Sequence, residues 1–144
     1  MSNVTVTVSQ AAADIARCHQ IRRTVFIEEQ NVPAELEVDG RDPEALHFLA
    51  LGPDGSLLGC ARMRVVDGVA KAERVAVLSA KRGLGIGRAI MSAMEDEARA
   101  AGLRRLKLSA QVQVIPFYEN IGYTCYGDVF VEADINHRWM HREL

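Results

Sequence analysis

The sequence predicts an α+β fold, a mostly antiparallel sheet with helices on its faces. Three observations support this prediction. Apolar and polar residues alternate along several short segments joined by tight turns, as in antiparallel strands. One long segment instead has apolar residues at three- and four-residue steps, as in an amphipathic helix. Because this segment lies between two strand-like segments, it predicts a crossover and one parallel pair of strands.

The first half begins with a strand and a helix. Alternating valines predict a strand at residues 4–8. A helix is predicted from about Ala11 to Glu29, because apolar residues recur near one face: Ile15, Cys18, Ile21 and Val25. It ends before the turn at residues 31–33. The acidic, turn-rich stretch from Glu35 to Glu44 is predicted to be a loop.

The remaining elements follow from the spacing of turns and apolar residues. Short turns, including Asp67-Gly68, predict an antiparallel meander of three strands at residues 47–51, 57–66 and 69–77. The amphipathic helix starts near Ile86 and ends at Gly102. A strand at 106–110, a short helix at 114–121 and strands at 123–126 and 131–143 follow. The sheet is expected to have about six to seven strands and about four flanking helices.

Composition and charge restrict the class of protein. The length suits one domain, residues 1–144. A net charge of −2 gives no general attraction to nucleic acid, and no apolar run reaches the roughly 18 residues of a membrane span. The first ten residues do not resemble a signal peptide, so a cytoplasmic location is expected. The three cysteines lack CxxC spacing, and His137 and His141 lie in a predicted strand, so no disulfide framework or metal site is expected.

A glycine-rich loop, Arg82-Gly83-Leu84-Gly85-Ile86-Gly87, precedes the strongest helix. The first turn of a helix has free backbone N–H groups and a partial positive charge, and glycines let a phosphate approach the backbone. Lys81 and Arg88 add positive charge, and no acidic residue lies in residues 81–94. The loop is therefore predicted to bind an anion such as a pyrophosphate. It has neither the Gly-Lys-Ser/Thr of a Walker loop nor the spacing of the dinucleotide fingerprint.

Three segments in order resemble the GNAT superfamily of acyl-CoA-dependent N-acetyltransferases. They are Glu73-Arg74-Val75-Ala76-Val77, the glycine loop, and Pro116-Phe117-Tyr118-Glu119-Asn120-Ile121-Gly122-Tyr123. Three further segments resemble its ElaA/YjcF-like branch: residues 22–33, Asp39-Gly40-x-Asp42 and Leu108-Ser109-Ala110-Gln111. The resemblance covers essentially the whole chain. It implies a GNAT-like fold whose parallel strand pair borders a cofactor cleft.

The resemblance also implies where the cosubstrate acetyl-CoA would bind. The backbone of residues on the strand before the loop would hold the pantetheine arm: Val75, Ala76 and Val77. Backbone amides of the loop would hold the pyrophosphate: Arg82, Gly83, Leu84, Gly85, Ile86, Gly87 and Arg88. Tyr118 matches the tyrosine that contacts the cofactor and protonates the departing thiolate. Gln111 stands where many members have Asn, so no pantetheine contact is assigned to it.

Acyl transfer to an amine requires a neutral amine, a polarised thioester carbonyl and a proton for the leaving thiolate. Glu73 is the first candidate for the base, because alternation along a strand places its side chain on the same face as that of Val75. By resemblance, a backbone N–H near Val75 would polarise the carbonyl. Alternative bases or acceptor-binding groups are Glu28, Glu29 and His137. A chain of water molecules fits the sequence equally well.

The acceptor is not identified beyond a primary amine of a small molecule. The acidic loop from Glu35 to Glu44 is either a solvated charged segment or a surface that attracts a cationic amine through Asp39 and Asp42. A non-catalytic acyl-CoA sensor and an acyl-homoserine-lactone-type synthase are the alternatives to an N-acetyltransferase. The intact glycine loop favours CoA over an acyl-carrier protein. The strand at 131–143 is a candidate for pairing two subunits in a homodimer.

Overall fold

The computed structural model describes residues 3–144 and contains one seven-stranded sheet in the order β1-β2-β3-β4-β5-β7-β6. Neighbouring strands are antiparallel except for β4 and β5, which are parallel. This confirms the predicted fold class. The strands are β1 (Thr5–Ser9), β2 (Leu46–Leu51), β3 (Leu57–Val66), β4 (Val69–Val77), β5 (Arg105–Gln111), β6 (Thr124–Glu132) and β7 (Ile135–Glu143).

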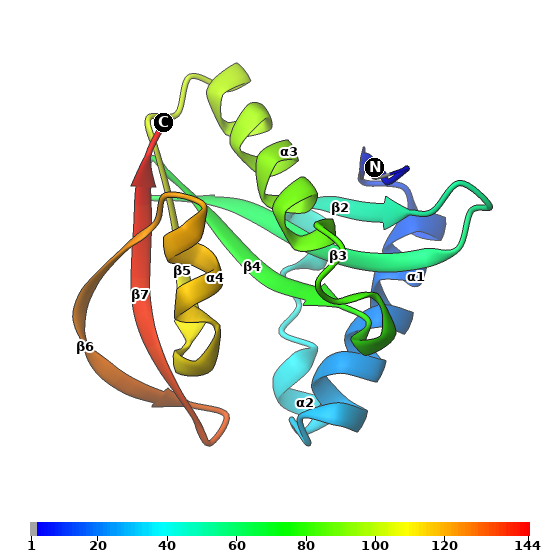
Figure 1. Cartoon of the computed structure of the whole chain (residues 1–144), viewed down its shortest axis with the longest axis horizontal. Helices are drawn as coiled ribbons and strands as arrows, with labels where there is room; N and C mark the ends of the chain where they lie inside the picture. Colours follow the sequence, from blue (N-terminus) through cyan, green and yellow to red (C-terminus); the bar gives the residue numbers. More distant parts are fainter. Residues whose placement is uncertain (1–2) are drawn as a thin grey trace.

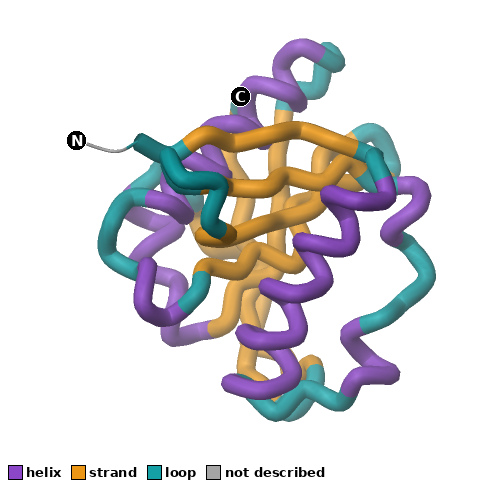
Figure 2. The backbone as a smooth tube through the Cα atoms, turned by 90° about the vertical axis from the view of Figure 1, so that its right-hand side faces the viewer, coloured by secondary structure: helices purple, strands orange, loops and turns teal. Residues whose placement is uncertain are grey.

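Helices cover both faces of the sheet (Figures 1 and 2). They are α1 (Ala12–Arg22), the π-helix η1 (Arg23–Glu29), α2 (Ala34–Glu37), α3 (Ile86–Ala100) and α4 (Ile115–Asn120). Short 3-10 turns are η2 (Asp42–Glu44), η3 (Ser79–Lys81) and η4 (Val112–Val114). η1 follows α1 without a break, so the predicted helix at residues 11–29 is confirmed. No helix within residues 3–144 is long and apolar enough to cross a membrane.

The larger part of the core lies between the sheet and helix α3. The apolar stripe of α3 is fully buried there: Ile86, Ile90, Met91 and Met94. Each such side chain stabilises the fold by about 1.5–3 kcal/mol relative to an exposed one. Helix α4 packs beside the start of α3, where a Cβ on Gly87 would lie only 2.9 Å from Cζ of Phe117. Glycine at this position therefore lets α4 lie close to the glycine loop.

The opposite face of the sheet carries α1. Cys18, Ile21 and Val25 pack there on side chains of β2, β3 and β4: Leu49, Cys60 and Ala76. Helix α1 contacts these three strands, so its continuation η1 ends near the C-terminal half of β4. The N-terminal helices thus border the same strand that precedes the glycine loop.

Two predictions about the chain's elements are wrong. Residues 131 and 132 belong to β6, and the chain turns at Ala133 and Asp134, whose φ angles are 52° and 60°. Neither is glycine, so the sequence contains no strong turn signal there. The predicted loop from Glu35 to Glu44 contains α2 and η2.

The strand β7 is not placed to pair two subunits. Since β7 pairs with both β5 and β6, it offers no free edge for a second subunit.

Candidate functional site

The strands β4 and β5 are paired only at their beginnings within the described chain. The paired residues are Ala70 with Leu106 and Lys71 with Lys107. Beyond them the two strands diverge toward Val77 and Gln111, as Figure 1 shows. The backbone N–H and C=O groups along this divergence are not used in a β4–β5 ladder, so they can bind an extended ligand.

A β-bulge interrupts β4 at the divergence. Glu73 pairs with Arg62 and Ala76 pairs with Cys60, so two residues of β4, Arg74 and Val75, stand opposite one residue of β3. Arg74 has a φ of 54°. After the bulge, Val75 packs with the core on the α3 side, whereas Ala76 packs with the α1 side.

The bulge overturns the predicted common face of Glu73 and Val75. The carboxylate of Glu73 accepts a hydrogen bond from Arg62, which also bonds Asp42 on the α1 side of the sheet. A β-bulge adds one residue and reverses the alternation of side chains beyond it. Glu73 and Val75 therefore lie on opposite faces.

The glycine loop leads into the N-terminus of α3. Gly83 and Gly85 have φ angles of 80° and 82°, a backbone region that other residues enter only with strain. A Cβ on either residue would meet no atom within 4 Å, so the space beside this backbone is open. The first turn of α3 contains no acidic residue, and Arg88 is exposed. The loop therefore has the backbone conformation and charge of an anion site.

Arg82 is held in an ion pair beside this loop. Its guanidinium donates to Glu29 at 2.7 and 2.9 Å and to the carbonyl oxygen of Val77 at 3.0 Å. The hydrogen bonds from Arg82 lower the pKa of Glu29. Glu29 thus connects the end of η1 to the loop, with both carboxylate oxygens bonded to Arg82, and Glu28 is exposed to solvent.

Two buried tyrosines differ in how their hydroxyl groups are used. The hydroxyl of Tyr123 donates to Glu95 Oε2 at 2.7 Å. The hydroxyl of Tyr118 has no hydrogen-bond partner among the described residues, and its ring packs edge-on against Phe117 and Tyr123. Burial raises the pKa of Tyr118, so its phenol stays protonated at neutral pH. Tyr118 is therefore the one of the two whose proton is available to a ligand.

Glu73 belongs to an ion-pair network. It accepts hydrogen bonds from Arg62 at 3.0 Å and Arg64 at 2.8 Å, and Lys71 Nζ lies 2.8 Å from its Oε2. Burial alone would raise the pKa of Glu73, but the hydrogen bonds from Arg64 and Lys71 and the charge of Arg62 outweigh it and lower the pKa to about 2. Such a carboxylate is a poor acceptor of a proton at neutral pH.

The acidic loop is part of the same network. The carboxylate of Glu37 accepts hydrogen bonds from Arg22 and Arg74, and that of Asp42 accepts them from Arg22 and Arg62. Asp39 pairs with Arg62 and Arg74, and the hydrogen bond from Arg62 lowers its pKa. Because arginines pair with these three acids, the hypothesis that Asp39 and Asp42 attract a cationic amine finds no support in the structure.

His137 lies on β7 directly opposite Gln111, the last residue of β5. Its Nδ1 is 2.7 Å from the carbonyl oxygen of Ile135, a contact that requires Nδ1 to carry the proton. Nε2 then has a free lone pair. The ring is 8% exposed and stacks on Phe130 at 5.7 Å.

An amide bridge closes the far end of the strand divergence. Gln111 Nε2 donates to Gln30 Oε1 at 2.8 Å, and Gln113 Nε2 donates to Gln111 Oε1 at 2.6 Å. Gln30 follows the last residue of η1. The bridge therefore joins the N-terminal helices to β5 across the divergence.

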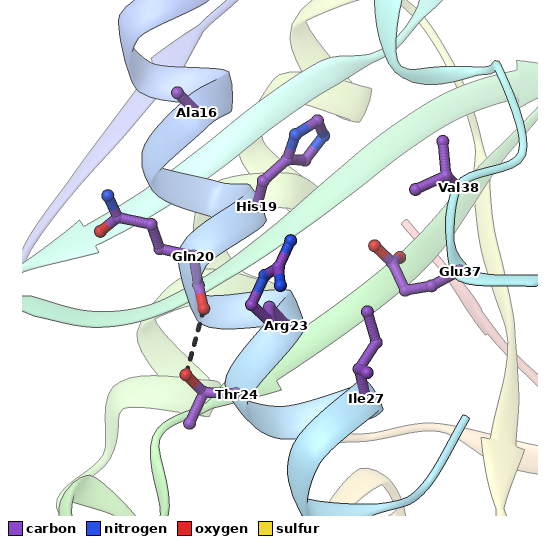
Figure 3. Close-up of a pocket in the computed structure, with 8 residues that line it drawn as sticks. All are labelled: Ala16, His19, Gln20, Arg23, Thr24, Ile27, Glu37 and Val38. Carbon is purple, nitrogen blue, oxygen red and sulfur yellow. Dashed lines mark hydrogen bonds between the residues drawn. The ribbon is translucent and has the colours of Figure 1, made fainter. Parts of the chain in front are cut away.

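Two surface hollows flank the N-terminal helices. The first, of about 460 Å³, lies on the exposed side of α1 and η1 and is lined by His19, Arg23 and Ile27 among others (Figure 3). Figure 3 shows these side chains projecting from the helix toward Glu37 and Val38. The second, of about 540 Å³, lies between the segment that follows η1 and the β6–β7 turn: Gln30, Asn31, Pro33, Leu36, Val131, Ala133, Asp134 and Ile135.

Sequence reasoning missed the buried arginines and the amide bridge. Arg22 and Arg62 are each 1% exposed. Their positions carried a signal, because Arg22 follows Cys18 by one helical turn and Arg62 interrupts an apolar strand. A buried arginine requires an acidic partner, which the acidic loop supplies. Gln30 and Gln111 gave no comparable signal.

Comparisons with known proteins agree with this geometry. Residues 15–123 match the model of the Acetyltransferase (GNAT) family. The chain is 39% identical over 125 residues to the uncharacterized N-acetyltransferase YjcF of Bacillus subtilis (strain 168), covering 85% of this chain and 88% of that protein. An acyl-CoA N-acyltransferase from Pseudomonas aeruginosa is 31% identical with a TM-score of 0.85, covering 96% of this chain and 99% of the other.

Escherichia coli ElaA is similar in structure as well. It is 27% identical with a TM-score of 0.84, and the match covers 97% of this chain and 99% of ElaA. The match to the family model spans most of the chain and includes β4, the glycine loop and Tyr118. The protein is therefore a member of the GNAT family of acetyltransferases.

Proposed function

We propose that the protein transfers an acetyl group from acetyl-CoA to a primary amine by direct attack of the amine within a ternary complex. The observation that carries this proposal is the uncommitted hydroxyl of Tyr118, on a helix that packs against the glycine loop through Phe117 and Gly87. A proton donor thus lies next to an anion site and the divergence of β4 from β5.

The residues at the loop and the divergence fit the two parts of CoA. When bound, acetyl-CoA supplies an activated thioester. Backbone amides of the loop would hold the pyrophosphate, because the first turn of α3 leaves those of Ile86, Gly87 and Arg88 without intrahelical acceptors. The N–H of Arg82 already donates to the carbonyl oxygen of Ser79. Backbone groups of residues 75–77 that are not used in the β3–β4 ladder would hold the pantetheine arm, beside the Val77 carbonyl oxygen that accepts from Arg82. An N–H at the bulge would polarise the thioester carbonyl.

Tyr118 is the proposed general acid. Its phenol is protonated at neutral pH and can donate to the departing sulfur. The sulfur would leave as a thiol instead of a thiolate, and the Tyr118 phenolate would regain, through solvent, the proton that the acylated nitrogen gives up. Tyr123 cannot take this role without giving up its hydrogen bond to Glu95.

His137, directly or through water, replaces Glu73 as the proposed base. The hydrogen bond from Nδ1 to Ile135 fixes the tautomer and leaves Nε2 able to accept a proton from the incoming ammonium. Its position opposite Gln111 places it at the acceptor end of the divergence. Glu73 is unsuited, because its oxygens are occupied and its pKa is about 2.

The test is release of free thiol from acetyl-CoA in the presence of a broad set of amines. Amine-dependent release, together with an acetylated amine detected by mass spectrometry, is the expected result. Binding of acetyl-CoA without release for any amine would contradict the transferase and support the sensor. His137→Gln should lower kcat and leave the affinity for acetyl-CoA unchanged.

A further inference from the structure

We infer that the acceptor is a primary amine on an uncharged apolar body, alkyl or aralkyl, and that the second hollow binds this body. The inference rests on the proposed function. It adds a substrate class and a binding site, formed by the segment after η1 on one side and the β6–β7 turn on the other.

The position of the hollow connects it to the reaction. Gln30 lines the hollow and accepts a hydrogen bond from Gln111, which ends β5 at the far side of the divergence. His137 is two residues from Ile135, another lining residue, and stands opposite Gln111. A molecule in this hollow can therefore direct an amino group toward the divergence.

Five of the eight residues that line the hollow are apolar. Leu36 on one wall is 53% exposed and Val131 on the other is 66% exposed. Pro33, Ala133 and Ile135 add further apolar surface. Binding of an apolar body would remove these side chains from water, which is favourable in proportion to the area covered.

The charge of the hollow selects against anionic acceptors. Asp134 is the one charged residue among the eight that line it. A carboxylate on the acceptor would meet this like charge and no lining cation. By contrast, the ammonium form of an amine is attracted, and Gln30 Nε2, which bonds no described residue, can donate to a neutral oxygen or to water.

Three amines with the same reactive group test this inference. They are 2-phenylethylamine, phenylalanine, which adds a carboxylate, and spermidine, which lacks an apolar body. We expect kcat/KM for 2-phenylethylamine to exceed those of the other two at least about tenfold. Equal values, or a preference for phenylalanine or spermidine, would overturn the inference while leaving the transferase intact.

Two substitutions locate the site. Leu36→Asn and Val131→Asn, which remove apolar surface without adding charge, should each raise KM for 2-phenylethylamine about tenfold and leave KM for acetyl-CoA unchanged. Val65→Asn is the matched control, because Val65 is 58% exposed and lies beside the β3–β4 turn. Unchanged KM values in both variants would contradict the site. Absence of amine-dependent thiol release across the broad set would refute the proposed function and this inference with it.

Discussion

Arg74 has a left-handed backbone, and its Nε donates to Glu37 Oε2 at 2.9 Å. Its Nη2 also donates to the carbonyl oxygen of Glu37 at 3.2 Å and to Asp39 at 3.3 Å. A non-glycine residue in this region costs of order 1–3 kcal/mol unless its surroundings hold it there. The acidic loop therefore stabilises the bulge formed by Arg74 and Val75.

Neutralising Glu37 should disturb this bulge. In Glu37→Gln the ion pairs with Arg22 and Arg74 are lost, so the backbone N–H groups near Val75 should be less well positioned. We expect kcat to fall about tenfold or more, with little change in the affinity for acetyl-CoA. The control is Glu35→Gln, an exposed acid on the same short helix. Equal kcat values for the two variants would show that the loop does not act on the bulge.

A Cβ in the glycine loop should weaken cofactor binding. Gly85 is the N-cap of α3 and has a φ of 82°, a backbone conformation that alanine adopts only with strain. Gly85→Ala also adds an atom where the phosphate would approach. We expect KM for acetyl-CoA to rise about tenfold or more.

Gly68→Ala separates strain from binding. Gly68 has a φ of 77° in the β3–β4 turn, so alanine there should cost a similar free energy of unfolding. Its KM for acetyl-CoA should equal that of the wild type. If both variants raise KM equally, the effect of Gly85→Ala arises from folding and not from the loop.

Removal of the Tyr118 hydroxyl should affect catalysis more than stability. Tyr118→Phe deletes a group without a protein partner among the described residues, so the melting temperature should change little. We expect kcat to fall about 10²–10⁴-fold, the usual contribution of a general acid. Tyr123→Phe should show the reverse, a loss of about 1–3 kcal/mol of stability, because the buried Glu95 Oε2 loses its donor while Oε1 keeps its bond to Arg142. An unchanged kcat in Tyr118→Phe would remove this residue from the mechanism.

Local patterns predicted most of the fold. The bounds of β3 and β4 and the start of α3 follow from turn residues and periodicity, which depend on neighbours in sequence. The bulge at Arg74 was not predictable in this way, because its partners Glu37 and Asp39 lie 37 and 35 residues away. For the same reason Glu73 was assigned a free carboxylate, although three cations surround it. The glycine loop and Tyr118 could be proposed from the sequence because each lies in a contiguous motif.

Loss of Arg22 should destabilise the fold strongly. Its guanidinium pairs with Glu37 at 2.7 Å and Asp42 at 2.8 Å and is 1% exposed. Arg22→Met fills similar space but leaves two carboxylates without this partner, and breaking a buried pair costs about 3–5 kcal/mol. Urea denaturation measures the change. The exposed neighbour Arg23, substituted in the same way, should change stability by less than about 0.5 kcal/mol.

The ion-pair network should also make the protein sensitive to acid. The pKa of Glu73 is about 2 in the folded state, below its ordinary 4.5, since Arg64 and Lys71 outweigh the effect of burial. As the pH falls, Glu73 therefore binds a proton in the unfolded chain before it does so in the folded protein. The stability that Glu73 contributes is complete above about pH 4.5 and is lost as the pH falls toward 2. The free energy of unfolding should decrease over this range. Glu73→Gln should be less stable at pH 7 and lose less stability between pH 5 and pH 2.5 than the wild type; identical pH slopes would contradict the lowered pKa.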